Sequence, residues 1–208
     1  TNSEIVVFRK PYTSDIDNFL NDHKNKYCFI AFSGHGFHNP KDNRTKILLN
    51  DIFKEYDIGN MKPRGSKGTL LIDACRNVET PVFEQVEKLA EFSSRADFSN
   101  RRMEDFYSAS DIWHQNLAKS LPGIVTMYSC DIGESADEYP KGSSLSGGIY
   151  TTALMSYARY WENSAANRSC YNTKTAHDDT ASYMKKAYPQ QNPVYSTVSC
   201  YFPFAVKA

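Results

Sequence analysis

Short apolar runs that are rich in β-branched and aromatic residues recur along this chain, and they constrain its fold more than any other feature. Three of these runs, at residues 27–32, 69–72 and 124–128, are nearly continuous rather than alternating. Such runs are typical of central strands that are covered on both faces. Two further runs, residues 5–8 and a segment within 194–206, also predict strands.

Segments with helical spacing lie between the predicted strands. Thr13 or Ser14 can cap one helix, and a pattern that starts at residue 80 predicts a second. Residues 148–161 and 175–188 carry two more helical patterns. Strands that alternate with helices build a mainly parallel sheet with helices on both faces. The sequence therefore predicts an α/β fold of three layers, and 208 residues fit a single domain of this kind.

The stretch from residue 93 to residue 120 differs from the rest of the chain. Ser, Asn, Arg and Asp crowd its first part, residues 93–105, and the apolar periodicity weakens there. Clusters of these polar residues are typical of connections at the surface. We expect a surface loop or linker at residues 93–120.

Charge and cysteine content exclude several classes of function. The 24 Lys and Arg residues balance 24 Asp and Glu residues, so nothing indicates a nucleic-acid or membrane-surface partner. The sequence has neither an apolar run of transmembrane length nor a signal peptide at its start. The cysteines are odd in number, widely spaced and without a Cys-x-x-Cys pair, which argues against a disulfide framework or a zinc site. We expect a cytoplasmic protein without a metal or cofactor, and the sequence leaves a calcium requirement open.

Reactive residue types follow two of the predicted central strands. Functional residues of an open α/β sheet gather at the carboxyl ends of its strands. Here the run 27–32 leads to His35 and the run 69–72 leads to Cys75, and neighbouring parallel strands would bring both residues to one rim. An imidazole can deprotonate a thiol and later protonate a leaving amine. Either residue alone would more often be structural, but together they predict nucleophilic acyl transfer.

Glycines beside His35 provide a further element of such a site. Gly34 and Gly36 permit unusual backbone angles and a close approach of substrate. The backbone N–H groups of Gly36 and Cys75 can converge on the oxyanion that develops during acyl transfer. The sequence thus predicts an oxyanion hole made of main-chain donors.

Two segments carry a resemblance to a known superfamily. Residues 29–36 resemble the histidine strand of the caspases, metacaspases and paracaspases, and residues 70–76 resemble their cysteine strand. The caspase signature is Gln-Ala-Cys, then Arg, Gln or Gly, then Gly, with the histidine about 50 residues upstream. Here the histidine precedes the cysteine by 40 residues, Asp73 replaces the Gln, and Asn77 replaces the final Gly.

Softer similarity extends over most of the chain, from residue 5 to residue 206. The segments that carry it are 124–130, 134–138, 147–154, 191–193 and 202–204, and the last two are common in bacterial members. The resemblance implies a caspase-like three-layer sandwich, mainly a parallel sheet with helices on both faces. The superfamily's first strand has no clear counterpart, and the first predicted strand starts at Ile5. We therefore expect a single caspase-like peptidase domain at 1–208 that lacks its first strand as a fragment or processed product.

The resemblance also implies what the chain cleaves. In this superfamily the residue two before the nucleophile lines the pocket for the substrate side chain. Asp-cleaving caspases build that pocket from Arg and Gln, whereas metacaspases and paracaspases carry an Asp, as this chain does at Asp73. An acidic pocket pairs with Arg or Lys and repels Asp. Glu138 matches a second acidic position and Asp137 is a weaker neighbour; the structural alternatives are a capping residue at position 73 and a solvated one at 138.

Self-cleavage is a further implication of the resemblance. Caspase relatives often carry a cleavable linker between the cysteine strand and the next strand. The candidate positions in that interval are Arg95, Arg101, Arg102 and Lys119. Cleavage there would free the loops around Cys75 to rearrange, while the alternative is that these residues are simply solvated.

The sequence thus predicts a cysteine endopeptidase that cleaves after Arg or Lys through a Cys-His dyad and a thioester. Its partners would be protein or peptide substrates and an upstream chain segment or regulatory partner. The alternative is a catalytically silent caspase-fold scaffold or interaction module. An α/β-hydrolase is disfavoured because Ser33 lacks the Gly-x-Ser-x-Gly context, and a nucleotide-binding module because no strand precedes a phosphate-binding glycine loop.

Overall fold

A four-stranded sheet forms the centre of the protein, which was analysed as a computed structural model that describes residues 5–49, 54–78, 103–139, 147–196 and 200–208. The strand order is β1-β5-β6-β8, with β1 at Cys28–Ser33, β5 at Lys67–Asp73, β6 at Gly123–Tyr128 and β8 at Val194–Tyr195. The first three strands are parallel and β8 runs antiparallel to β6. This sheet confirms the predicted α/β class. The runs 69–72 and 124–128 form its two inner strands, whereas the run 27–32, predicted as a central strand, forms β1 at the edge of the described sheet.

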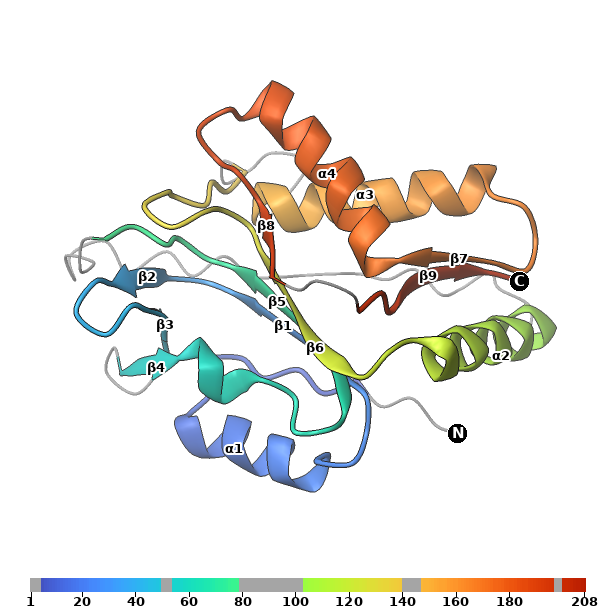
Figure 1. The fold of residues 1–208 in the computed structure, drawn as a ribbon, viewed down its shortest axis with the longest axis horizontal. Coiled ribbons are helices and arrows are strands. Elements are labelled where there is room, and N and C mark those ends of the chain that lie inside the picture. Colours follow the sequence, from blue (N-terminus) through green and yellow to red (C-terminus); the bar gives the residue numbers. More distant parts are fainter. Residues whose placement is uncertain (1–4, 50–53, 79–102, 140–146, 197–199) are drawn as a thin grey trace.

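Helices cover both faces of this sheet. They are α1 at Thr13–Asp22, α2 at Met103–Lys119, α3 at Ile149–Ser164 and α4 at Thr173–Ala187. Figure 1 shows α1 on one side of the sheet and α3 and α4 on the other. The layers follow from the period of two in a strand, because alternate side chains point to opposite faces.

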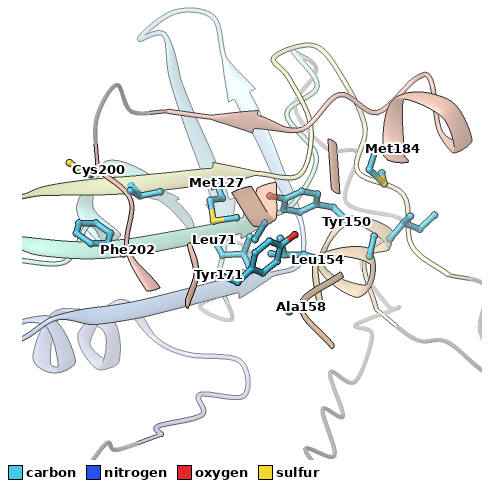
Figure 2. Close-up of a cluster of buried hydrophobic side chains, with 13 residues drawn as sticks. Leu71, Met127, Tyr150, Leu154, Ala158, Tyr171, Met184, Cys200 and Phe202 are labelled. Atoms are coloured by element: carbon cyan, nitrogen blue, oxygen red, sulfur yellow. The ribbon is translucent and has the colours of Figure 1, made fainter. Parts of the chain in front are cut away.

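The central strand β5 shows this alternation directly. Its Leu70 and Ile72 pack in a cluster with Leu20 of α1. The residue between them, Leu71, packs in the opposite cluster with Leu154 of α3 (Figure 2). All of these side chains are at most 4% exposed. The two buried clusters therefore lie on opposite faces of one strand.

Two small antiparallel sheets flank the central one. The first contains β2 at Gly36–Asn39, β3 at Arg44–Leu48 and β4 at Glu55–Asp57, followed by a 3-10 turn at Ile58–Met61. The second pairs β7 at Ser169–Asn172 with β9 at Pro203–Lys207. The strand predicted within 194–206 is thus two strands, β8 and β9, in separate sheets. In the parts of the chain that the structure describes, no helix has the length and apolar composition for crossing a membrane.

Residues 5–8 do not form the predicted strand. They belong to no strand in the part of the chain that the structure describes, and their four side chains are 41–79% exposed. A β-branched run favours a strand only where a neighbouring strand can pair with it and bury it. The first helix is placed correctly, although Asp15 rather than Thr13 or Ser14 completes its start by accepting a hydrogen bond from the Tyr12 N–H at 2.8 Å.

The prediction of a surface loop at residues 93–120 is also wrong for most of its length. Residues 103–119 form the helix α2, whereas residues 93–102 and the helix predicted from residue 80 lie outside the described part. Ile112 is buried, Trp113 packs edge-on against Tyr27, and the Lys67 ammonium donates to the Leu117 carbonyl at 2.5 Å. The helix is therefore stabilised by tertiary contacts that its polar sequence does not reveal.

Candidate active site

The pairing of β1 with β5 brings His35 and Cys75 to the same rim of the sheet. The last paired residues of the two strands are Ser33 and Asp73. Each strand reaches its reactive residue two positions later. The Gly34 N–H donates to the Asp73 carbonyl at 3.1 Å, so the two chains are still held together as they leave the sheet. His35 and Cys75 are both partly buried at this rim.

Gly36 lies against the backbone that carries Cys75. A Cβ at position 36 would lie only 2.9 Å from the Cys75 carbonyl oxygen and 3.0 Å from the Ala74 Cβ. Real Cβ atoms do not come that close to a backbone oxygen. Glycine is therefore needed here for a close approach rather than for an unusual φ.

The hydrogen-bond pattern of β2 indicates where the Gly36 N–H points. Gly36 is paired with Ile47 of β3, and the bond beside this pair runs from the Leu48 N–H to the His35 carbonyl. This makes Gly36 a non-hydrogen-bonded pair, with its own N–H directed away from β3. The N–H two residues on, at His38, has the same direction and donates to the Asn77 carbonyl at 2.8 Å. The Gly36 N–H is thus directed to the side on which Cys75 lies.

The Cys75 thiol contacts the loop that follows β6, residues 131–138. Its Sγ accepts from the Ala136 N–H at 3.3 Å and lies 3.7 Å from the Ala136 carbonyl oxygen. Burial raises the pKa of Cys75, and the negative charges of Asp137, Glu138 and Asp73 raise it further, against the opposing effect of the Ala136 N–H. The sulfur is therefore a protonated thiol at neutral pH and needs a base to become a nucleophile.

The residues after Cys75 fasten the 131–138 loop. The Arg76 N–H donates to the Glu134 carbonyl, and the Gly133 N–H donates back to the Arg76 carbonyl, both at 2.9 Å. The Arg76 guanidinium is buried, lies 4.0 Å from the centre of the Tyr128 ring and donates to the Cys130 carbonyl. The loop and the Cys75 segment therefore form one connected structure.

Asp73 lies beneath the start of α3. It is 4% exposed, and its Oδ2 accepts from the Thr151 N–H at 3.1 Å and from the Thr151 hydroxyl at 2.5 Å. A Cβ at Gly148 would collide with the carboxylate. Burial raises the pKa of Asp73, and the bonds from Thr151 oppose that rise. Asp73 therefore accepts hydrogen bonds in the first turn of α3, which is a capping role like the structural alternative considered for this residue.

Asp137 and Glu138, in contrast, are exposed. The Asp137 carbonyl accepts from the Ile149 N–H at 2.9 Å, and Glu138 forms an isolated bridge with Gly148. These bonds attach the end of the loop to the start of α3, directly above Asp73. The three predicted acidic residues therefore lie in one region beside Cys75, with Asp73 inside and the other two at the surface.

Several residues of this region were not singled out by the sequence. Thr151 anchors Asp73, Ala136 contacts the thiol, and Gln191 bonds the loop from behind. All three lie in segments that carry the softer family resemblance, but nothing in the sequence linked Thr151 to position 73, Ala136 to position 75 or Gln191 to position 137. No cluster of three His, Cys, Asp or Glu side chains among the described residues could hold a metal ion.

Only one of the four predicted self-cleavage positions lies in the part of the chain that the structure describes. Arg95, Arg101 and Arg102 lie outside the described residues. Lys119 is exposed and ends the helix α2, where the Ser120 N–H still bonds to the Asn116 carbonyl. It does not lie in an extended loop.

The family model of the caspase domain matches residues 7–204 of this chain. This chain belongs to the caspase domain family. The match confirms the resemblance inferred from residues 29–36 and 70–76, and it places the chain in a family of cysteine peptidases. No curated protein matches the chain.

Solved structures support the same caspase fold. The crystal structure of caspase-1 from Spodoptera frugiperda has a TM-score of 0.55 and 14% sequence identity, covering 97% of this chain and 76% of that one. A structural genomics target from Geobacter sulfurreducens has a TM-score of 0.51 and 17% identity, covering 94% of this chain and 78% of that one. At these identities the likeness concerns the fold alone.

Proposed function

We propose that this caspase domain is a cysteine endopeptidase that cleaves protein chains after Arg or Lys. One observation carries the proposal: the register of β1 and β5 brings His35, Gly36 and Cys75 together at a rim that three acidic side chains share. Cys75 is the nucleophile, His35 the general base and acid, and the acidic side chains select the substrate.

The reaction starts from a protonated thiol. His35 removes the Cys75 proton as the sulfur attacks the carbonyl carbon of the scissile bond. The backbone N–H groups of Gly36 and Cys75 stabilise the oxyanion that forms. The protonated imidazole then gives its proton to the leaving amine, which leaves a thioester on Cys75. Water hydrolyses this thioester with His35 again as the base.

The acidic side chains explain the choice of substrate. Asp137 and Glu138 are exposed and can pair directly with a guanidinium or ammonium group. Asp73 adds negative charge from beneath Gly148. A substrate Asp would instead meet like charge on Asp137 and Glu138, which disfavours its binding. The same charges raise the pKa of Cys75, so a bound basic side chain compensates them and favours the thiolate.

The competing function is a silent scaffold with the same fold. The two are distinguished by a peptide electrophile that carries Arg before its reactive group, with an otherwise identical Asp peptide as the control. We expect the Arg probe to label Cys75, as located by mass spectrometry, and the Asp probe to leave it unmodified. Labelling of neither type, or equal labelling by both, would overturn the proposal.

Two variants test the catalytic pair. Cys75→Ala abolishes cleavage of an Arg-containing peptide, and His35→Ala lowers kcat by a factor on the order of 10² to 10⁴, the usual contribution of a general base. Circular dichroism establishes that both variants remain folded. Wild-type turnover in folded Cys75→Ala would exclude it as the nucleophile.

A further inference from the structure

The Gln191 side chain connects the 131–138 loop to the end of β6 through two hydrogen bonds. It is 1% exposed, although it carries a polar amide. Its Oε1 accepts from the Asp137 N–H at 3.1 Å, and its Nε2 donates to the Ser129 carbonyl at 3.0 Å. A buried amide is costly unless it is paired, and here both ends of the amide are paired.

Each partner of Gln191 is already fixed on its other side. The Ser129 N–H donates to the Ile72 carbonyl at 2.9 Å, which ties Ser129 to β5 next to Asp73. The Asp137 carbonyl accepts from the Ile149 N–H of α3 at 2.9 Å. With the bond from Gln191, both main-chain groups of Asp137 are held, and only its exposed carboxylate is left to meet a substrate.

The chemistry of this bridge requires an amide. One end must accept a hydrogen bond from an N–H, and the other must donate one to a carbonyl, at a fixed separation. A carboxylate can accept at Asp137 but repels the Ser129 carbonyl, and an aliphatic side chain of similar length can do neither. The neighbouring Asn192 bonds the Glu134 carboxylate through its backbone N–H and its side chain, so this segment fastens the 131–138 loop at two points.

We propose that Gln191 is a positioning residue for the basic-residue pocket: its amide sets the position of Asp137 relative to the strand end at Ser129, and thereby sets the preference for a charged substrate side chain. The inference rests on the proposed Arg and Lys specificity. Gln191 itself does not touch the substrate.

The experiment compares two peptides that differ only before the scissile bond, one with Arg and one with citrulline, its uncharged near-isostere. The readout is the ratio of their kcat/KM values in wild type and in Gln191→Met. We expect the ratio to fall about tenfold in the variant, the equivalent of one or two lost neutral hydrogen bonds, mainly through a higher KM for the Arg peptide. Tyr171→Phe is the control, because it removes a bond between β7 and α4, from the Tyr171 hydroxyl to Asp179, and leaves the bonds of the 131–138 loop in place. It should lower stability without changing the ratio.

A second variant, Gln191→Glu, keeps the test valid if Gln191→Met fails to fold. An ionised Glu repels the Ser129 carbonyl, whereas a protonated Glu can donate to it and restore the bridge. Activity of Gln191→Glu relative to wild type, measured at each pH, should therefore rise as the pH falls, which a merely structural role would not produce.

The outcomes separate the two proposals. A wild-type protein that does not prefer Arg over citrulline overturns the proposed specificity, and the role of Gln191 with it. A wild-type preference that persists unchanged in folded Gln191→Met, or in Gln191→Glu at every pH, overturns the role of Gln191 alone.

Discussion

At the scale of single residues, the acidic surroundings of Cys75 work against its ionisation. Burial and three nearby carboxylates all raise the pKa of the thiol, and the Ala136 N–H is the one stabilising contact of the sulfur among the causes of the shift. A peptidase with such a cysteine stays protonated between turnovers. In the proposed mechanism, its thiolate forms when His35 and a basic substrate side chain are both in place.

Alkylation of Cys75 by iodoacetamide should therefore require a higher pH than an ordinary thiol, whose pKa is about 8.5. Replacing Asp137 by Asn removes the largest of the three charge effects, so the midpoint of alkylation should move to lower pH. Asp131→Asn is the matched control, because Asp131 belongs to the same loop but does not contribute to the pKa of Cys75. The measurement is the rate of modification against pH by mass spectrometry. An unchanged midpoint in Asp137→Asn would contradict the electrostatic argument.

The sequence singles out candidate residues for this site but not their contacts. His35 and Cys75 are candidates because they follow two strands with continuous apolar patterns. Asp73 is a candidate through the family resemblance, but its bonds to Thr151 carry no sequence signal, because residues 78 positions apart meet only in the folded chain. Gln191 is the clearest case: its role depends on the conformation of a loop that lies 54 positions away.

At the scale of elements, the start of α3 and the end of β5 are built around one carboxylate. Gly148 begins the helix with φ of −64°, an angle that alanine also adopts, so a side chain there meets no backbone strain. What it meets is Asp73. The lack of a side chain at position 148 is what allows Asp73 to lie under the helix.

Gly148→Ala should therefore destabilise the protein by about 1–3 kcal/mol, as overpacking of a filled site does. Thermal or urea unfolding measures the loss. In the background of Asp73→Ala the same substitution should cost much less, because the carboxylate that it strikes is gone. Equal costs in both backgrounds would show that the collision with Asp73 is not the cause.

Secondary structure was predicted correctly where the segment's own apolar pattern shows that it is buried. The central strands and the helices α3 and α4 carry continuous or periodic apolar patterns, and each was placed to within a few residues. The small sheet of β2, β3 and β4 was missed because its strands are short and rich in polar and charged residues. At residues 5–8 the error is the reverse, a predicted strand that does not form. The composition of this segment suits a strand, but nothing in the described structure pairs with it.

At the scale of the whole molecule, one buried histidine makes stability depend on pH. His177 of α4 is 4% exposed, and its Nδ1 lies 2.7 Å from the Tyr150 hydroxyl. Burial lowers the pKa of His177 to about 4; the charge of Asp178 opposes this effect, and the charge of Lys174 adds to it. The folded protein therefore keeps this imidazole neutral at a pH where the unfolded chain would charge it.

The sign of the effect follows from linkage. Between pH 6.5 and pH 4 the unfolded state binds the extra proton, so the contribution of His177 is complete above pH 6.5 and decreases as the pH falls. The loss by pH 4 amounts to about 3 kcal/mol. Urea unfolding at several pH values measures it, and His177→Asn should flatten the dependence. A slope that persists in His177→Asn would assign the effect to other groups.

Self-processing is a prediction about the chain as a whole. Purified active protein should release fragments that end at Arg95, Arg101 or Arg102, because these basic residues match the proposed pocket. Lys119 should not be cut in the folded protein, since it ends a helix. Intact-mass and peptide mapping after incubation test this, with Cys75→Ala as the uncleaved control. Identical fragments in both samples would point to a contaminating protease.

The alternation along β5 has a consequence for how freely this fold can change. Leu70 and Ile72 belong to one buried cluster and Leu71 to the other, so the two clusters share a main chain but hardly any side-chain neighbours. Substitutions in separate clusters, such as Leu154→Ala and Ile47→Val, should have nearly additive costs. Each layer can then accumulate changes without forcing compensation in the other. A fold with this independence tolerates wide divergence, as the 14% identity shared with an insect caspase illustrates.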